Sequence, residues 1–124
     1  MIPARLVLAV QDSRYVEPLL SYLHGSSYGS ALQVTAFTRT DSFLHYMEVG
    51  EVPNLVVGDT EMLESWLSRG ETSVPWLLLS EGHSSSSLLE GGSSTFKYQP
   101  LPQLMEVIIT HCKRSGGTLE KLNV

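Results

Sequence analysis

Short apolar runs alternate with segments of helical periodicity along most of the chain, and this alternation limits the possible folds more than any other feature. Three of the runs are almost continuously apolar, which is typical of parallel strands covered on both faces. The five runs are Leu6–Val10, Leu32–Phe37, Leu55–Val57, Val74–Leu79 and Thr95–Tyr98. Strands that alternate with helices predict βαβ units and one parallel sheet.

The first helical segment is marked by an amphipathic stripe that includes Val16, Leu19 and Leu23. Proline fits a helix best in its first turn, and Pro18 lies within this segment. The regular helix is therefore expected to begin near Tyr15 or Val16 rather than at Ser13.

Three further helices follow from the same spacing. One contains Phe43, is opened by Thr40 or Asp41 and stops at Gly50. Another contains Trp66 and has Thr60 as a candidate N-cap, with Glu61 in the first turn, Arg69 in the last and Gly70 just beyond. The last carries Leu101, Leu104, Met105, Ile108 and Cys112 on one face.

Right-handed crossovers place the helices on both faces of the sheet. With five strands, the flavodoxin-like order 2-1-3-4-5 is the natural choice, and ligands of such folds bind at the carboxyl ends of the strands. Between the fourth and fifth runs, serines and glycines replace the helical pattern, so the fourth helix of such a fold is expected to be shortened or missing.

Length and charge restrict the function classes. A chain of 124 residues fits one domain, and a net charge of −5 without a Lys/Arg cluster argues against a nucleic-acid partner. A single cysteine favours a reducing compartment, and apolar runs far shorter than about 20 residues argue against membrane insertion. We expect a cytoplasmic protein. No catalytic signature of a hydrolase or kinase is present, so we expect no enzyme.

Polar side chains stand where four of the expected strands end. Asp12 follows the first strand, Asp59 the third, Ser80 the fourth, and Lys97 lies at the end of the fifth. Parallel strands bring these positions to one edge of the sheet, so the four side chains are expected to share one crevice.

In these residues the chain resembles the receiver domains of response regulators. The resemblance implies that Asp59 accepts a phosphoryl group, that Asp12 and Asp59 bind Mg²⁺, and that Ser80 and Lys97 contact the phosphate. Mg²⁺ favours carboxylate oxygens, and a lysine ammonium is a compact phosphate partner.

The chain departs from the receiver pattern at three positions. Gln11 replaces the first member of the acidic pair, Tyr98 stands where a proline usually follows the lysine, and Ser94 stands where an aromatic residue usually precedes it. These departures favour an atypical receiver domain that binds a protein partner or forms a homodimer. A working receiver, phosphorylated on Asp59 by a histidine kinase or a small phosphodonor, is the alternative.

A narrower resemblance rests on Lys97-Tyr98-Gln99, which is similar to the N-terminal receiver-like domain of TadZ/CpaE-type pilus-assembly ATPases. It implies a receiver-like domain over residues 1–115 and a tail or linker to an absent domain over 116–124. A flavodoxin-like cofactor binder is the weakest hypothesis, because the turn after the first strand lacks a Ser/Thr-rich phosphate loop.

Simpler roles compete with these. Asp12 and Asp59 each fit the N-cap of the following helix. Lys97 needs an acidic partner at a strand end, so a structural Lys97–Asp59 pair without phosphate also fits the sequence.

Overall fold

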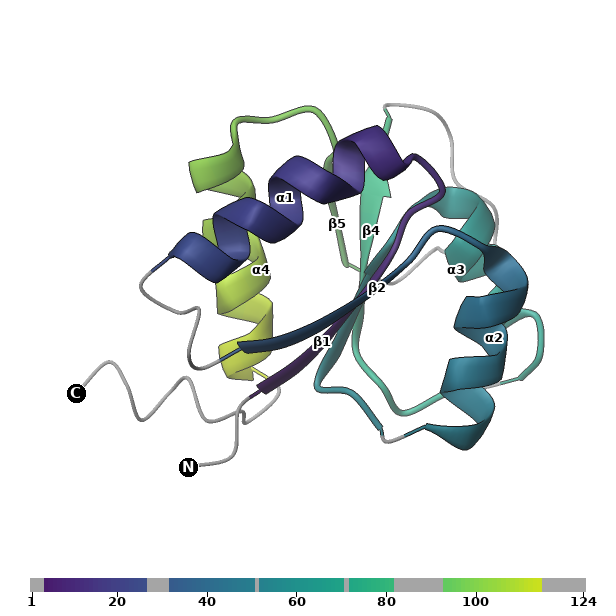
Figure 1. Ribbon diagram of the computed structural model, residues 1–124. Coiled ribbons are helices and arrows are strands. Elements are labelled where there is room, and N and C mark those ends of the chain that lie inside the picture. Colours follow the sequence, from purple (N-terminus) through teal and green to yellow (C-terminus); the bar gives the residue numbers. More distant parts are fainter. Residues whose placement is uncertain (1–3, 27–31, 51, 71, 82–92, 115–124) are drawn as a thin grey trace.

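The computed structural model describes residues 4–26, 32–50, 52–70, 72–81 and 93–114. The elements follow one another as β1 (Ala4–Ala9), α1 (Ser13–Gly25), β2 (Leu32–Phe37), α2 (Thr40–Val49), β3 (Leu55–Gly58), α3 (Thr60–Leu67), β4 (Trp76–Ser80), β5 (Ser93–Phe96) and α4 (Leu101–Arg114). Figure 1 shows the single twisted sheet between its helices.

The sheet is parallel throughout and has the order β2-β1-β3-β4-β5. The predicted flavodoxin-like architecture is therefore confirmed. The expectation of a shortened or missing helix between β4 and β5 falls on residues 82–92, and the boundary between 115 and 116 falls on residues 115–124. Both lie outside the described residues.

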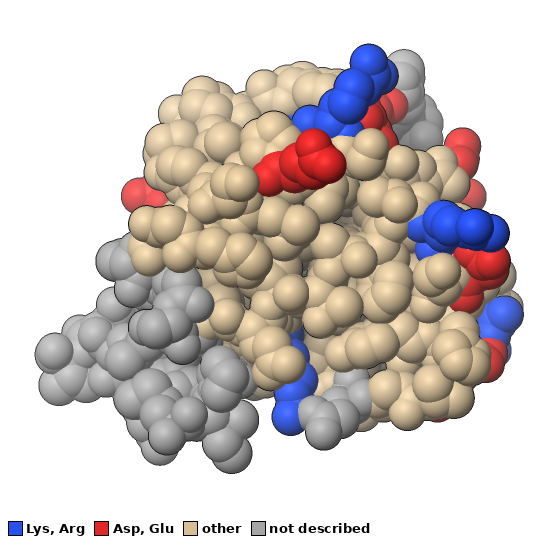
Figure 2. Space-filling model, in the orientation of Figure 1, with Lys and Arg blue, Asp and Glu red and all other residues tan. Residues whose placement is uncertain are grey.

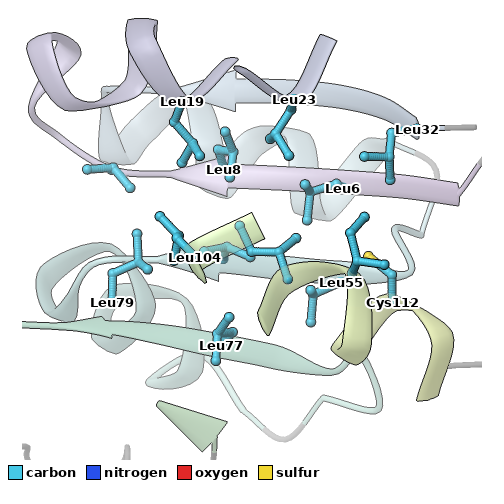
Figure 3. Close-up of a cluster of buried hydrophobic side chains, with 14 of the residues drawn as sticks. Leu6, Leu8, Leu19, Leu23, Leu32, Leu55, Leu77, Leu79, Leu104 and Cys112 are labelled. Carbon is cyan, nitrogen blue, oxygen red and sulfur yellow. The ribbon is translucent and has the colours of Figure 1, made fainter. Parts of the chain in front are cut away.

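Two apolar layers hold the helices against the sheet. Alternate residues of β1 point to opposite faces, so Leu6 and Leu8 join one layer while Val7 and Ala9 join the other. The first layer packs under α1 and α4, as Figure 3 shows for Leu19, Leu23, Leu104 and Cys112. The second packs under α2 and α3 through Phe43, Met62, Leu63 and Trp66.

Glycine is required where β3 approaches β1. A Cβ atom at Gly58 would lie 2.9 Å from the carbonyl oxygen of Ala9 and 3.1 Å from Cγ of Leu63. The missing side chain lets the end of β3 lie close to β1, which brings the residue after each strand to the same edge.

The expected start of the first helix is wrong. Helix α1 begins at Ser13 because the side chain of Asp12 caps it, accepting a hydrogen bond from the Arg14 backbone amide at 3.0 Å. Pro18 lies inside the helix and is exposed, so its ring does not disturb the core. The cap thus extends the helix beyond the point to which proline preference alone would confine it.

The other boundaries differ by one or two residues. Asp59 rather than Thr60 is the N-cap of α3, and the N-cap of α2 is Arg39, which makes no side-chain capping bond. Strand β5 ends at Phe96, so Lys97 follows the strand rather than belonging to it. No helix of the described ranges has the length and apolar character needed to cross a bilayer.

On the face drawn in Figure 2, charged side chains form separate spots, and in those at the top and on the right basic and acidic residues are neighbours. Arg14 pairs with Asp12 and Arg39 with Asp41, both near helix N-termini. Arg69 pairs with Glu48 and links the end of α3 to α2. Exposed pairs of this kind contribute little to stability.

Candidate functional site

A hollow of about 420 Å³ lies at the edge where β1, β3 and β4 end. Each strand end contributes short polar segments, because the parallel strands stop in register and the chain turns there into the next helix or loop. The lining residues are Gln11, Asp12, Asp59, Thr60, Glu61, Leu79, Glu81, Lys97 and Tyr98.

Asp59 is held by backbone amides on both carboxylate oxygens. Its Oδ1 accepts from the Met62 amide at 2.9 Å, which caps α3, and its Oδ2 accepts from the Gln11 amide at 2.9 Å, beyond the end of β1. Its own amide donates to the Ala9 carbonyl at 3.0 Å. Asp59 therefore ties the end of β1 to the start of α3.

Asp12 is exposed at the rim of the hollow. The hydrogen bond from the Arg14 backbone amide lowers the pKa of Asp12, and the charges of Arg14 and Lys97 lower it further. Desolvation acts in the opposite direction but is outweighed, so the pKa of Asp12 lies below its ordinary value. Its Oδ1 caps α1, which confirms the prediction that Asp12 fits the N-cap of the following helix.

Lys97 is buried, with only 6% of its surface exposed. Its Nζ lies 3.1 Å from Oε1 of Glu81 and sits over the rings of Tyr15 and Tyr98, at 5.1 and 5.4 Å from their centroids. The hydroxyl of Tyr98 donates to the same Oε1 at 2.8 Å. One carboxylate, two aromatic faces and one ammonium thus form a compact cluster, which we call the Lys97 cage.

Opposing effects act on the pKa of Lys97. Burial disfavours the charged ammonium, but the hydrogen bond and negative charge of Glu81 outweigh it, so the pKa is raised above its ordinary value. Tyr98 and Asp59 add smaller contributions in the same direction. The ammonium in the cage is therefore charged throughout the neutral range.

No protein-family model matches the sequence, and no curated protein does either. Solved structures do match in fold. The receiver domain of a Francisella response regulator superposes with a TM-score of 0.71 at 15% identity, covering 90% of this chain and 98% of that one. The signal receiver domain of a Luxo repressor protein from Vibrio parahaemolyticus gives 0.69 at 18%, covering 98% and 97%.

A response regulator receiver protein from Pseudomonas putida gives a TM-score of 0.64 at 11% identity, covering 89% of this chain and 98% of that one. The chain has the receiver-domain fold. At such low identities the likeness concerns the fold of this receiver-like domain alone.

The receiver-like domain brings together three of the four side chains predicted to meet. Asp12, Asp59 and Lys97 line the hollow, but Ser80 is not among the described residues that line it. Ser80 is half-buried at the end of β4, where its carbonyl accepts from the Lys97 amide at 2.8 Å.

The simpler alternative for Lys97, a structural pair with Asp59, is wrong. Among the ion pairs of the described residues, Lys97 is joined to Glu81, while Asp59 influences it only through its charge. Ser80 is paired with Phe96 in the β4–β5 register, so the next two residues, Glu81 and Lys97, lie side by side. The sequence shows an acid directly after Ser80, but its partner becomes evident only once the register is known.

The donor set has fewer carboxylates than the magnesium site that the resemblance implies. In the described ranges, no group of three or more His, Cys, Asp and Glu side chains is placed to hold a metal ion. Gln11 stands in place of a carboxylate, and both oxygens of Asp59 already accept backbone amides. As arranged, Asp12 and Asp59 cap α1 and α3, respectively.

Tyr15 should give the domain a measurable alkaline pH dependence. Burial, and to a smaller extent the charge of Tyr98, raises the pKa of Tyr15 from 10.0 to about 12. The folded state thus holds this proton more tightly than the unfolded chain, so the resulting stability is complete below pH 10 and is lost as the pH rises to 12. We expect a loss of about 1–2 kcal/mol, reduced by solvent screening of a half-buried ring.

The measurement is urea unfolding at several pH values for the wild type and Tyr15→Phe. The variant lacks the ionisable hydroxyl and also its hydrogen bond to the Lys97 carbonyl, which is 2.5 Å long. Its stability should be lower by about 1 kcal/mol at pH 8 and should fall less steeply between pH 10 and 12. Parallel curves for the two proteins would contradict the assignment.

Proposed function

We propose that this receiver-like domain is a protein–protein interaction module rather than a phosphorylation switch, and that it is not itself an enzyme. The supporting observation is the state of Asp59, whose two carboxylate oxygens each accept a backbone amide. Those bonds give the side chain a structural task at the position where the resemblance puts the phosphoryl acceptor.

Phosphoryl transfer to a carboxylate places several demands on a site. It needs an accessible oxygen as nucleophile and a metal ion to offset the charge that gathers on the transferred group. Each oxygen of Asp59 already accepts one backbone amide, and a phosphoryl group attached to either oxygen would have to fit beside that amide. Gln11 removes one negative charge that would attract the metal. Both features oppose phosphorylation.

Titration with beryllofluoride and Mg²⁺ tests the proposal, with ¹H–¹⁵N NMR spectra as the readout. We expect no saturable shifts in the amides around Asp59. The Asp59→Asn variant is the matched control, because it lacks the attachable carboxylate and shows any nonspecific effect of the reagent. Saturable shifts in the wild type that are absent from the variant would refute the proposal.

The kind of partner is suggested by two exposed aromatic side chains near the end of β5. Phe96 and Tyr98 are 52% and 61% exposed, and aromatic residues are enriched in protein interfaces. Together with the Lys97-Tyr98-Gln99 resemblance, they support a role in a larger TadZ/CpaE-type pilus-assembly ATPase, through a protein partner or a homodimer. Light scattering after size-exclusion chromatography tests the homodimer, which Phe96→Ser should weaken.

A working receiver is the second candidate. It is favoured by the fact that Asp12, Asp59 and Lys97 line one hollow. Incubation with acetyl phosphate and Mg²⁺, followed by intact-mass measurement, distinguishes the two. A species heavier by about 80 Da, the mass of one phosphoryl group, would support this candidate if Asp59→Asn abolished it.

A further inference from the structure

We propose that Glu81 acts as a built-in anion. Its carboxylate takes the place beside Lys97 that an external anion would otherwise occupy, and so closes the hollow to external anions. The inference deepens the proposed function, on which it rests, by naming what keeps the receiver-like site inactive. It concerns the Lys97 cage and requires no particular state of Asp59.

The contacts of the Lys97 cage give Glu81 this role. An ammonium has three donors and no acceptor, and one of them is directed to Oε1 of Glu81 at 3.1 Å. The rings of Tyr15 and Tyr98 cover two sides of the ammonium and shield it from water. An external anion that approached the ammonium would thus compete with a carboxylate of the same chain.

The tyrosine that flanks Lys97 also anchors Glu81. The Tyr98 hydroxyl donates to the same Oε1 that receives the ammonium. Hydrogen bonds to a charged acceptor are stronger than neutral ones, and the second donor restrains a side chain that is otherwise 44% exposed. Glu81 is therefore held in the cage by two contacts that depend on its negative charge.

The remaining charges of the hollow act in the same sense. Among the described residues, its lining includes the carboxylates of Asp12, Asp59, Glu61 and Glu81 and one cation, Lys97. With Lys97 compensated by Glu81, an incoming anion meets an acidic surface. Without the charge of Glu81, a largely buried cation would lack its partner and would favour another anion.

The size of the effect follows from competition inside the molecule. When a site is free in only a fraction of the molecules, the apparent affinity of a ligand equals its intrinsic affinity multiplied by that fraction. If Glu81 leaves Lys97 free in about one molecule in ten, removing that competitor tightens anion binding about tenfold.

The test compares Glu81→Gln with Glu61→Gln in the full chain, using inorganic phosphate as the probe. Each substitution removes one negative charge from the lining of the same hollow, but only Glu81 contacts Lys97. The readout is the phosphate-dependent shift of the Lys97 and Tyr98 backbone amides in ¹H–¹⁵N spectra, at constant ionic strength. Far-UV circular dichroism verifies that both variants are folded.

We expect phosphate to bind Glu81→Gln at least about tenfold more tightly than the wild type, with Glu61→Gln close to the wild type. Equal gains in both variants would show a general charge effect and overturn the inference. It would also be overturned if neither variant gained affinity, or if the wild type bound phosphate as tightly as Glu81→Gln.

Tyr98→Phe provides a second route if Glu81→Gln does not fold. It keeps the charge of Glu81 and the ring over Lys97 but removes one of the two bonds that hold the carboxylate, so a smaller gain in phosphate affinity is expected. No gain would count against the inference. These outcomes are independent of the beryllofluoride titration, since a wild type that binds beryllofluoride refutes the proposed function without measuring the Glu81 competition.

Discussion

Replacing Phe43 with alanine is expected to lower the free energy of unfolding by about 3–5 kcal/mol, which is a large part of the stability of a typical domain. Phe43 is fully buried, and its ring centroid lies 6.2 Å from that of Phe37 and 5.9 Å from that of Trp66. It is the buried residue by which α2 joins the layer under α2 and α3. Alanine would leave a cavity that the rigid sheet cannot close.

Urea unfolding followed by tryptophan fluorescence measures this effect, because Trp66 packs against the substituted ring. Phe96→Ala is the matched control: it makes the same chemical change at a side chain that is 52% exposed and should cost less than about 1 kcal/mol. Similar losses for the two variants would mean that α2 is not anchored through Phe43.

Replacing Asp59 with alanine is expected to cost about 2–3 kcal/mol. The substitution removes the cap of α3, worth about 1 kcal/mol, and a charge-assisted hydrogen bond to the Gln11 amide, 48 residues away along the chain. If Asp59 served only as a phosphoryl acceptor, replacing it would not lower the stability in this way. Its carboxylate would then repel neighbouring negative charges instead of accepting hydrogen bonds from backbone amides.

The matched control is Asp12→Ala, which removes the corresponding cap of α1 but no bond to another strand. Its expected cost is about 1 kcal/mol. The free energy of unfolding of Asp59→Asn should lie between those of the wild type and Asp59→Ala, because an amide oxygen can replace only one of the two acceptors. If Asp59→Ala proves neutral or stabilising, Asp59 does not connect β1 to α3 in solution.

The sheet could be predicted from the sequence because its determinants are local. Leu6–Val10 and Leu55–Val57 are apolar on both faces, which suits only strands between two helical layers. Handedness and short connections then leave few possible strand orders. By contrast, the start of α1 was missed because the capping bond of Asp12 outweighed the expected effect of Pro18.

The candidate site could be located but not assembled from the sequence. Asp12, Asp59 and Lys97 follow from the rule that strand ends meet at one edge. The partner of Lys97 does not, since it depends on the β4–β5 register that places Glu81 beside it. Nor could the sequence show that Tyr15 joins the cage, because Tyr15 lies 82 residues away from the carbonyl that its hydroxyl reaches.

The position of Cys112 makes the domain convenient for site-directed labelling. It is the only cysteine in the sequence, is fully buried under the sheet, and its burial raises the pKa of its thiol to about 12. A maleimide dye would therefore react with one cysteine introduced on the exposed side of α1, such as at Glu17, while the native thiol stays unmodified. Fluorescence anisotropy of that single dye could then report a partner docking on the folded domain, with no need to remove a core residue.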